Sequence, residues 1–239
     1  MNNAWDDVGT LISENDPADI IPALAADNRE LAWPPILETI RSVFGCTSGQ
    51  RILDYGCGTG DFCRHLHSLG NAVAGCDSST RMLEIATLRV PPAVILLESE
   101  VLLASKPRLD VVTAVMVFSF VPTLDKILPQ LLSMIDPGGV MVIATFNPPF
   151  VANLAAAGMS FCDLDDPRRP TKAVMRMKPG LRIPVFVRSA EQYAAFFGGY
   201  GWKEISRIRP PFHPVFREQH PVPFPVEDPE FLIQGFIKG

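Results

Sequence analysis

Residues 52–60 limit the possible folds of this chain more than any other segment does. They read Ile-Leu-Asp-Tyr-Gly-Cys-Gly-Thr-Gly, so an apolar run ends in a carboxylate and glycines follow at every second position. Residues 51–55 are typical of a buried strand, and residues 61–69 are typical of a helix. A strand, a glycine turn and a helix form a cradle for a nucleotide-like ligand, because glycine permits positive φ and lets a ligand approach the backbone.

Strands and helices alternate through much of the chain. We expect strands at 51–55, 72–76, 94–97, 110–118 and 140–146, with helices at 61–69, 81–89 and 124–134 between them. Further along, we expect a helix at 190–197 and strands at 202–208 and 231–237. Strands joined by crossover helices form a doubly wound sheet. The pattern predicts an α/β fold with a Rossmann-like, mostly parallel seven-stranded sheet and helices on both faces.

Two regions are expected around this sheet. Residues 1–45 are predicted to be helical and contain Trp5 and Trp33, whereas residues 46–239 are predicted to form the ligand-binding α/β domain. Residues 146–190 separate the fifth and sixth strands by a long interval, so we expect a substrate-side insertion there.

Charge and cysteine content exclude several classes of protein. The net charge is −5 and the pI is near 5.4, whereas nucleic-acid-binding proteins normally carry a basic field. No pair of the five cysteines has Cys-x-x-Cys spacing, which argues against a disulfide framework or a metal site and fits a reducing cytoplasm. The N-terminus lacks a signal-peptide core, and the longest apolar run, residues 111–121, is too short to span a bilayer. We therefore expect a cytoplasmic protein without nucleic-acid or membrane partners.

The spacing of the glycine turn bears on the kind of ligand. A dinucleotide fingerprint is Gly-x-Gly-x-x-Gly, whereas the spacing here, Gly56-x-Gly58-x-Gly60, is one residue shorter. Asp54 stands just before the turn and would repel a pyrophosphate. The arrangement therefore favours a ligand with an ammonium group and no phosphate.

With this motif the chain resembles the class I S-adenosylmethionine-dependent methyltransferases. Their first motif is usually written as apolar residues, Asp or Glu, and then x-Gly-x-Gly-x-Gly, as in residues 52–60. The resemblance implies that Asp54, Gly56, Cys57 and Gly58 contact the cofactor. It also implies an antiparallel final strand, and an early helix that caps the site as a lid formed by residues 1–45.

Later residues carry the same resemblance. Asp77, at the end of the second expected strand, matches the acidic residue that holds both ribose hydroxyls in that family, and two vicinal hydroxyl donors suit one carboxylate. Residues 77–82 match the usual continuation, in which Met82 packs on adenine. The resemblance assigns the remaining cofactor contacts to Ser78, Glu98, Ser99, Glu100, Met116, Val117 and Phe118.

Few residues are candidates for catalysis. A sulfonium methyl is already activated, so holding a nucleophile in line with it can supply roughly 7–11 kcal/mol, and a general base is optional. The candidates are Asn147, after the fifth expected strand, and His213, in a proline-rich loop after the sixth. Residues 147–150 resemble the Asn-Pro-Pro-Phe motif of amino-methyltransferases, but that motif follows the fourth strand, so a nucleic-acid or glutamine substrate is not indicated. The expected substrate wall consists of Trp5, Trp33, Phe120, Phe146 and Asn147.

The sequence therefore predicts an S-adenosylmethionine-dependent methyltransferase that acts on a small-molecule metabolite by O-, N- or C-methylation, without a metal. Two alternatives stay open. One is an enzyme that consumes the cofactor without moving the methyl and has no second substrate, such as a cyclase that forms azetidine-2-carboxylate and releases methylthioadenosine. The other is a cofactor-binding protein without enzymatic activity.

Overall fold

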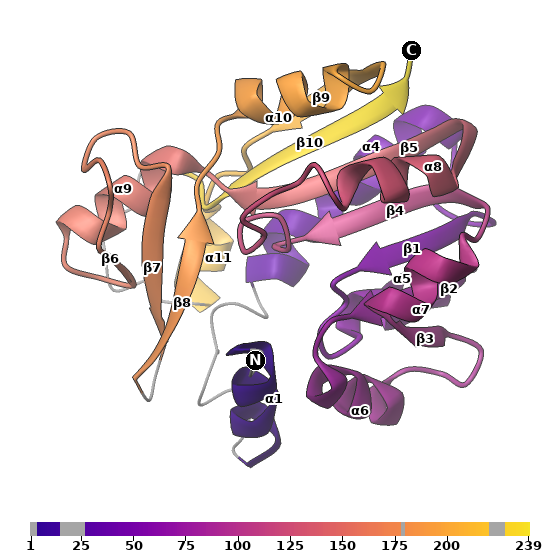
Figure 1. Cartoon of the computed structure of the whole chain (residues 1–239), viewed down its shortest axis with the longest axis horizontal. Helices are drawn as coiled ribbons and strands as arrows, with labels where there is room; N and C mark the ends of the chain where they lie inside the picture. Colours follow the sequence, from indigo (N-terminus) through magenta and orange to yellow (C-terminus); the bar gives the residue numbers. More distant parts are fainter. Residues whose placement is uncertain (1–3, 15–26, 178–179, 220–227) are drawn as a thin grey trace.

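The computed structural model describes residues 4–14, 27–177, 180–219 and 228–239. These residues form a seven-stranded sheet in the order β3-β2-β1-β4-β5-β10-β9, with helices on both faces (Figure 1). Strands β1 to β5 pair in parallel, whereas β10 runs antiparallel to both β5 and β9. The predicted fold class is confirmed, including its antiparallel final strand. The strands are β1 (Arg51–Tyr55), β2 (Ala72–Asp77), β3 (Ile95–Glu98), β4 (Leu109–Val115), β5 (Ile135–Phe146), β9 (Trp202–Ile208) and β10 (Phe231–Lys238).

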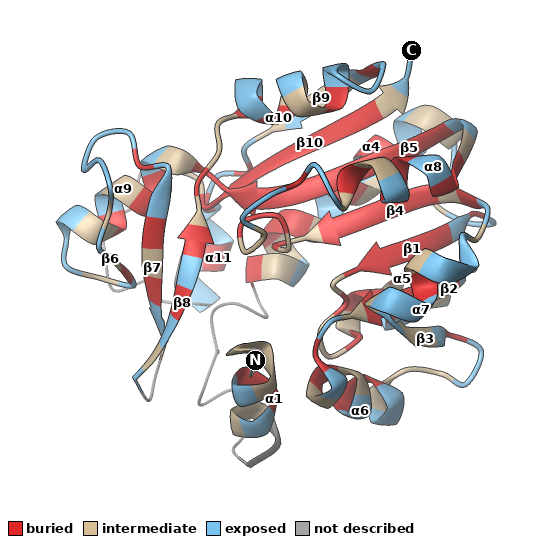
Figure 2. Ribbon diagram, in the orientation of Figure 1, coloured by how far each residue is buried: buried red, intermediate tan, exposed pale blue. Residues whose placement is uncertain are grey.

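The two faces of the sheet bury separate sets of side chains. Consecutive residues of a strand point to opposite faces, so Ile52 packs with α4 (Trp33–Phe44) and α5 (Asp61–Ser68). Leu53 packs with the helices of the opposite face, which are α7 (Ser99–Ser105), α8 (Leu128–Met134) and α10 (Ala190–Gly198). The central strands are buried along most of their length, as expected for strands covered on both sides (Figure 2).

Two further groups of elements lie beside the carboxyl ends of the parallel strands. In the first group, α1 (Ala4–Glu14) packs against α6 (Thr80–Arg89), and the π-helical turn η1 (Asn28–Ala32) leads into α4, which covers one face of the sheet. After β5, α9 (Pro148–Ala156) leads into a small antiparallel sheet of β6 (Phe161–Cys162), β7 (Lys172–Met177) and β8 (Leu181–Phe186). No helix of the described residues is long and apolar enough to cross a membrane.

Several predicted boundaries are wrong. The fourth strand ends at Val115 rather than 118, because Met116 adopts a positive φ of 58° and turns the chain. The helix expected at 124–134 begins only at Leu128. The fifth strand begins at Ile135 rather than 140, and residues 136–139 form an irregularity within it, where the pairing with β4 shifts from Leu109–Ile135 to Val111–Val140. The sequence analysis did not predict α7, β6, β7 or α11 (Pro214–Gln219), and residues 220–227 of the proline-rich loop lie outside the described part.

An aromatic stack joins α10 to the antiparallel edge of the sheet. The rings of Phe197 and Phe236 lie 3.7 Å apart between centroids and are nearly parallel, at 5°. Both side chains are fully buried. This contact holds α10 against β10, the strand that pairs with both β9 and β5.

Truncation of this stack tests the packing. We expect Phe236→Ala to lower the free energy of unfolding by about 3–5 kcal/mol, because it removes buried apolar atoms and leaves a cavity. Leu88→Ala is a suitable control, since Leu88 is 88% exposed, and surface substitutions usually change stability by no more than about 0.5 kcal/mol. Urea denaturation of both variants would measure the difference, and equal stabilities would contradict the packing.

Candidate functional site

The glycine turn between β1 and α5 depends on backbone that only glycine adopts easily. Gly56 and Gly60 have φ values of 75° and 80°. A Cβ at Gly56 would lie 2.2 Å from Cγ2 of Val117, and a Cβ at Gly60 would lie 2.7 Å from Cγ1 of Val90. A Cβ on Gly58 would meet no protein atom within 4 Å. The first and third glycines therefore permit close packing, while the second leaves open space for a ligand.

The end of β2 holds this turn in place. The N–H groups of Gly56 and Cys57 both donate to the Cys76 carbonyl, at 2.8 and 2.9 Å. Asp77 accepts the Gly58 N–H on Oδ2 and the Ser79 N–H on Oδ1, each at 2.9 Å. The carboxylate predicted to bind ribose is therefore oriented by backbone N–H donors on both of its oxygens.

Asp54 is buried beneath the turn. Its Oδ1 accepts the Thr113 hydroxyl at 2.9 Å, and its Oδ2 accepts the Cys63 thiol at 3.7 Å. Burial raises the pKa of Asp54 to about 6, an effect that the two hydrogen bonds oppose and the nearby Asp77 reinforces. Burial also raises the pKa of Asp77. Among the described residues, no cationic side chain forms a salt bridge with either carboxylate.

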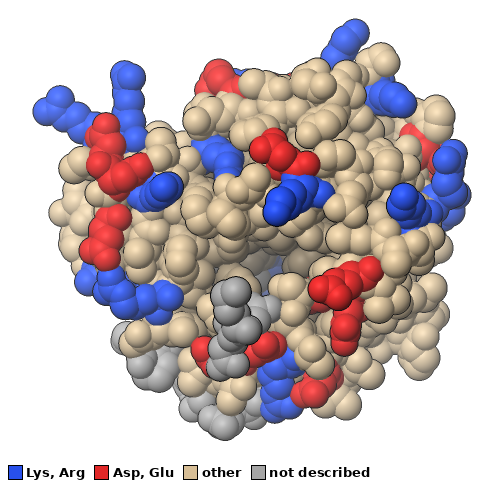
Figure 3. Space-filling model, in the orientation of Figure 1, with Lys and Arg blue, Asp and Glu red and all other residues tan. Residues whose placement is uncertain are grey.

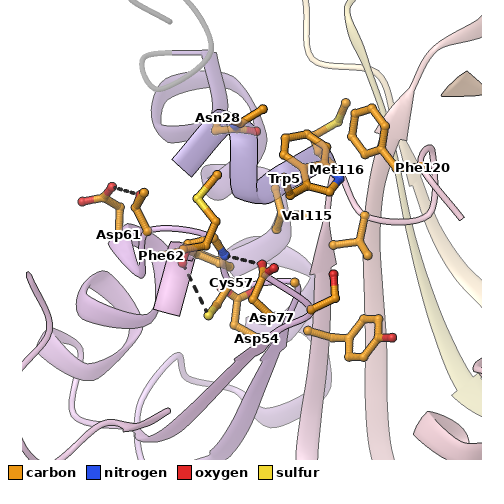
Figure 4. Close-up of a pocket in the computed structure, with 18 of the residues that line it drawn as sticks. Trp5, Asn28, Asp54, Cys57, Asp61, Phe62, Asp77, Val115, Met116 and Phe120 are labelled. Atoms are coloured by element: carbon orange, nitrogen blue, oxygen red, sulfur yellow. Dashed lines mark hydrogen bonds between the residues drawn. The ribbon is translucent and has the colours of Figure 1, made fainter. Parts of the chain in front are cut away.

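These groups open into a cavity of about 870 Å³ at the carboxyl ends of β1, β2 and β4. In the close-up, Trp5 and Phe120 lie beside each other on one side, with Asp54 and Asp77 near the strand ends (Figure 4). The predicted cofactor contacts that line the cavity are Asp54, Gly56, Cys57, Gly58, Asp77, Ser78, Met82, Ser99, Met116 and Val117. The predicted substrate contacts that line it are Trp5, Trp33, Phe120 and Phe146.

Three predicted cofactor contacts do not line this cavity. Glu98 and Glu100 are exposed at the start of α7, where the helix directs only Ser99 toward the cavity. Phe118 is fully buried with residues of α8 and α10 on the opposite side of the sheet, because the chain has already turned at Met116.

The two predicted catalytic residues also lie elsewhere. Asn147 is buried before α9, where its side chain donates to the Pro229 carbonyl at 2.8 Å and accepts from Arg209 Nε at 3.2 Å. Both ends of its amide are therefore used, the nitrogen to join α9 to the approach to β10 and the oxygen to join it to the segment after β9. His213 is exposed just before α11, and its carbonyl accepts the Arg217 N–H. Neither residue is among those that line the cavity.

The far end of the cavity is an apolar wall. Trp5 meets Phe120 edge to face at 4.8 Å between ring centroids, and Phe120 meets Phe146 in the same way at 6.1 Å. Met175 and Met177 of β7 complete it, and sequence reasoning missed them because residues 172–177 were not expected to form a strand. The wall therefore combines residues from α1, the loop after β4, β5 and the small sheet.

Arg188 holds the loop that carries Phe120. Its guanidinium donates to the backbone carbonyls of Phe118, Val121 and Pro122, at 2.7, 2.7 and 2.9 Å. The Ser119 hydroxyl accepts the Phe146 N–H at 3.1 Å, which ties the same loop to β5. These contacts fix the aromatic wall relative to the strand ends.

The side of the cavity along α5 contains stacked aromatic rings and a histidine. Trp33 stacks on Phe62 and His65, with ring centroids 4.9 and 5.1 Å apart. Burial lowers the pKa of His65, and the positive charge of Arg64 lowers it further. The described residues contain no cluster of His, Cys, Asp and Glu suited to a metal ion. Lys, Arg, Asp and Glu are interspersed around the hollowed centre of the face in Figure 3.

Comparison with known families and curated proteins gives consistent matches. The family model described as a methyltransferase domain matches residues 15–205. The ubiquinone biosynthesis O-methyltransferase of Chelativorans sp. (strain BNC1) is 32% identical over 104 residues, which are 41% of this chain and 41% of that protein. The enzyme of the same name from Bradyrhizobium diazoefficiens is 30% identical over 123 residues, covering 50% of this chain and 48% of that protein. The chain therefore spans less than half the length of these curated relatives.

Solved structures show the same fold at low sequence identity. An S-adenosylmethionine-dependent methyltransferase from Mesorhizobium loti has a TM-score of 0.62 and 19% identity, over 85% of this chain and 96% of its own. The DhpI–SAH complex has a TM-score of 0.63 and 19% identity, over 99% and 96%. Magnesium protoporphyrin IX methyltransferase from Synechocystis, with bound SAH, has a TM-score of 0.57 and 17% identity, over 86% and 83%.

A substitution at Gly56 tests the packing of the turn. In Gly56→Ala, the new Cβ would meet Val117 at 2.2 Å, and the residue would keep a φ of 75°. We expect the clash to lower the free energy of unfolding by about 1–3 kcal/mol, beyond the roughly 1–2 kcal/mol that a left-handed alanine costs. Calorimetric titration should also show that binding of S-adenosylmethionine is lost.

Gly45→Ala is the matched control for this substitution. Gly45 has the same φ of 75°, but no atom lies within 4 Å of its added Cβ. Val117→Ala removes the atoms that clash, so the double variant Gly56→Ala with Val117→Ala should recover part of the stability. Equal losses in the Gly45 and Gly56 variants would contradict the packing argument.

The buried charge of Asp54 predicts a pH-dependent gain in stability for Asp54→Asn. Since its pKa is raised from 3.8 to about 6 by folding, the folded protein binds this proton more tightly, and stability falls as pH rises from about 4 to 6. The cost above this window is up to about 3 kcal/mol. Asp54→Asn should therefore be more stable than the wild type at pH 8, should lose that advantage near pH 4, and should bind S-adenosylmethionine more weakly.

Urea denaturation at both pH values would measure this gain. Asp125→Asn is a suitable control because Asp125 is exposed. A gain of the same size at pH 4 and pH 8 would contradict the assignment of the cost to the Asp54 charge.

Proposed function

Because this chain belongs to the methyltransferase domain family of class I S-adenosylmethionine-dependent enzymes, we propose that it transfers the sulfonium methyl to an apolar small molecule. Membership in this family confirms the predicted family, the prediction that the chain is a transferase, and the prediction that S-adenosylmethionine is its cosubstrate. The observation that carries the proposal is the division of the cavity, with an aromatic wall on the far side and two carboxylates near the strand ends that form no salt bridge within the described part of the chain.

The carboxylate end fits S-adenosylmethionine. The Asp77 oxygens are oriented by the N–H groups of Gly58 and Ser79, which supports a role in holding the ribose hydroxyls. Asp54 is a buried carboxylate without a cationic partner among the described residues, so an ammonium group beside it would relieve the cost of its charge. The open space next to Gly58 supports close approach of the ligand to the backbone.

The cosubstrate supplies an activated methyl group. The chain contributes by positioning the cosubstrate and the acceptor and by enclosing them away from water. Trp5, Phe120 and Phe146 would exclude water from the acceptor and present aromatic faces to a cation, a contact worth roughly 0.5–2 kcal/mol. Arg188 and Ser119 hold this wall still through backbone groups. Rigid placement of the acceptor is itself a large part of the catalytic effect.

The acceptor is proposed to be a small molecule with an apolar body. Support comes from the aromatic and methionine lining of the far wall, since apolar pockets with few polar groups bind apolar ligands. The curated relatives are O-methyltransferases of ubiquinone biosynthesis, which favours oxygen as the methyl acceptor. We propose that residues 1–45 act as a lid, since α1 carries Trp5, and that residues 146–190 form a substrate-side insertion, since β7 carries Met175.

Labelled cosubstrate tests this function directly. Purified protein would be incubated with methyl-labelled S-adenosylmethionine, alone or with the low-mass or high-mass fraction of a cell extract. We expect S-adenosylhomocysteine and a labelled organic compound only with the low-mass fraction, and neither with Asp77→Ala, because Asp77 orients the turn and faces the cavity. Asp125→Ala is the exposed control.

The other outcomes separate the alternatives. Methylthioadenosine formed from the cosubstrate alone would contradict methyl transfer and indicate a cyclase or lyase. Label found only in protein or nucleic acid would contradict a small-molecule acceptor. Calorimetry without any heat of S-adenosylmethionine binding would contradict the proposed site itself.

A further inference from the structure

Asp6, in the first turn of α1, contacts the beginning of α6. Its Oδ1 accepts the Ser79 hydroxyl at 2.6 Å and lies 3.5 Å from the Arg81 N–H. Ser79 is fully buried, and its hydroxyl oxygen also accepts the Met82 N–H at 3.1 Å. A carboxylate is favoured at this position because the first N–H groups of a helix lack partners within the helix.

Ser79 joins Asp6 to the proposed ribose-binding residue. Its hydroxyl donates to Asp6, and its N–H donates to Asp77 Oδ1 at 2.9 Å. The other oxygen of Asp77 accepts the Gly58 N–H. A continuous series of hydrogen bonds therefore runs from the N-terminal helix, through Ser79 and Asp77, to the glycine turn.

Close packing holds α1 in this position. A Cβ on Gly9 would lie 2.8 Å from Cγ and 3.1 Å from Cβ of Arg81, so α1 approaches α6 as closely as glycine allows. Val8 is fully buried, and Trp5 meets Phe120 of the aromatic wall. The same helix therefore touches the carboxylate end of the cavity through Asp6 and the apolar end through Trp5.

The charge of Asp6 acts on Asp77 as well. Burial is the main reason why the pKa of Asp77 lies above its ordinary value; the N–H donors of Ser79, Gly58 and Ser78 oppose this, and the negative charge of Asp6 adds to it. The neighbouring elements contribute other titratable or charged side chains, which are Asp54 and Tyr55 on β1, Cys57 on the turn, Cys76 on β2, and Arg81 paired with Glu84 on α6.

We propose that Asp6 is a positioning residue of the cofactor site, which fixes Asp77 through Ser79 and links the docking of α1 to the binding of S-adenosylmethionine. The inference rests on the proposed role of Asp77 in holding the cofactor. Linkage is reciprocal, so a cofactor that binds more tightly when α1 is docked also strengthens the docking of α1. Because α1 carries Trp5, cofactor binding then helps to complete the aromatic wall.

Calorimetric titration with S-adenosylmethionine tests this inference without an acceptor. We expect Asp6→Ala to weaken binding about tenfold, since a hydrogen bond to a charged group is lost. Asp6→Asn keeps an oxygen that can accept from Ser79, so its loss should be smaller. The matched controls are Asp7→Ala and Asp7→Asn, which change the exposed neighbour on the same turn and should bind like the wild type.

The pH dependence of binding separates positioning of Asp77 from a general role in folding. Asp54 and Asp77 are both proposed to bind the cofactor as carboxylates, so affinity falls as pH drops through either pKa. In an Asp54→Asn background, the remaining fall in affinity at low pH reports the ionisation of Asp77. Without the charge of Asp6, Asp77 ionises at lower pH, so adding Asp6→Asn should move this fall to lower pH, whereas adding Asp7→Asn should not move it.

Gly9→Ala tests the docking of α1 independently. Alanine favours the helix itself over glycine, but its Cβ would press on Arg81. Weaker cofactor binding in this variant would therefore arise from displacement of α1, and binding equal to the wild type would contradict the linkage.

The outcomes distinguish this inference from the proposed function. A wild-type protein that binds no cofactor contradicts the proposed function and removes the inference with it. A wild-type protein that binds, together with an Asp6→Ala variant that binds as well as Asp7→Ala, overturns the inference alone. An unchanged pH dependence when Asp6→Asn is added to the Asp54→Asn background also overturns it, because the role of Asp6 would then be structural only.

Discussion

Asp77 lies at the carboxyl end of β2 with one oxygen bonded to the Gly58 N–H and the other to the Ser79 N–H. These two bonds join the glycine turn, which begins α5, to the turn that begins α6. Ser79 then extends the connection to Asp6 on α1. The carboxylate end of the cavity and α1 therefore share Asp77, and a change in its position or charge reaches α1, α5 and α6.

This arrangement buries negative charge, which lowers the free energy of unfolding. Burial raises the pKa of both Asp54 and Asp77, and no salt bridge of the described residues compensates either one. An isolated buried charge costs stability unless a partner neutralises it. A cationic ligand at this site would supply that partner, and a ligand that binds only the folded state adds stability as its concentration rises. The buried charges of Asp54 and Asp77 therefore offset part of the stability that the hydrophobic core provides.

The sequence predicts the parts of the site that depend on local backbone. Gly56, Gly58 and Asp77 were identifiable because a turn of positive φ and the residue at a strand end leave a short-range pattern. Tertiary contacts leave no such pattern. The wall residues Met175 and Met177 depend on pairing within a separate sheet, and Ser79 lies 73 residues from Asp6. Phe118 was misplaced because nothing in an apolar run indicates the left-handed turn at Met116.

The position of α1 couples the two ends of this cavity. Trp5 and Asp6 are consecutive, and neighbouring helical residues point in directions about 100° apart, so one turn reaches both the aromatic wall and the start of α6. Cofactor that strengthens the Asp6 contact would also hold Trp5 more firmly against Phe120. Trp5 already meets Phe120 in this structure, so bound cofactor would stabilise a wall that is already formed. Such coupling would suit methyl transfer, because a wall held in place keeps water away from the reactive sulfonium.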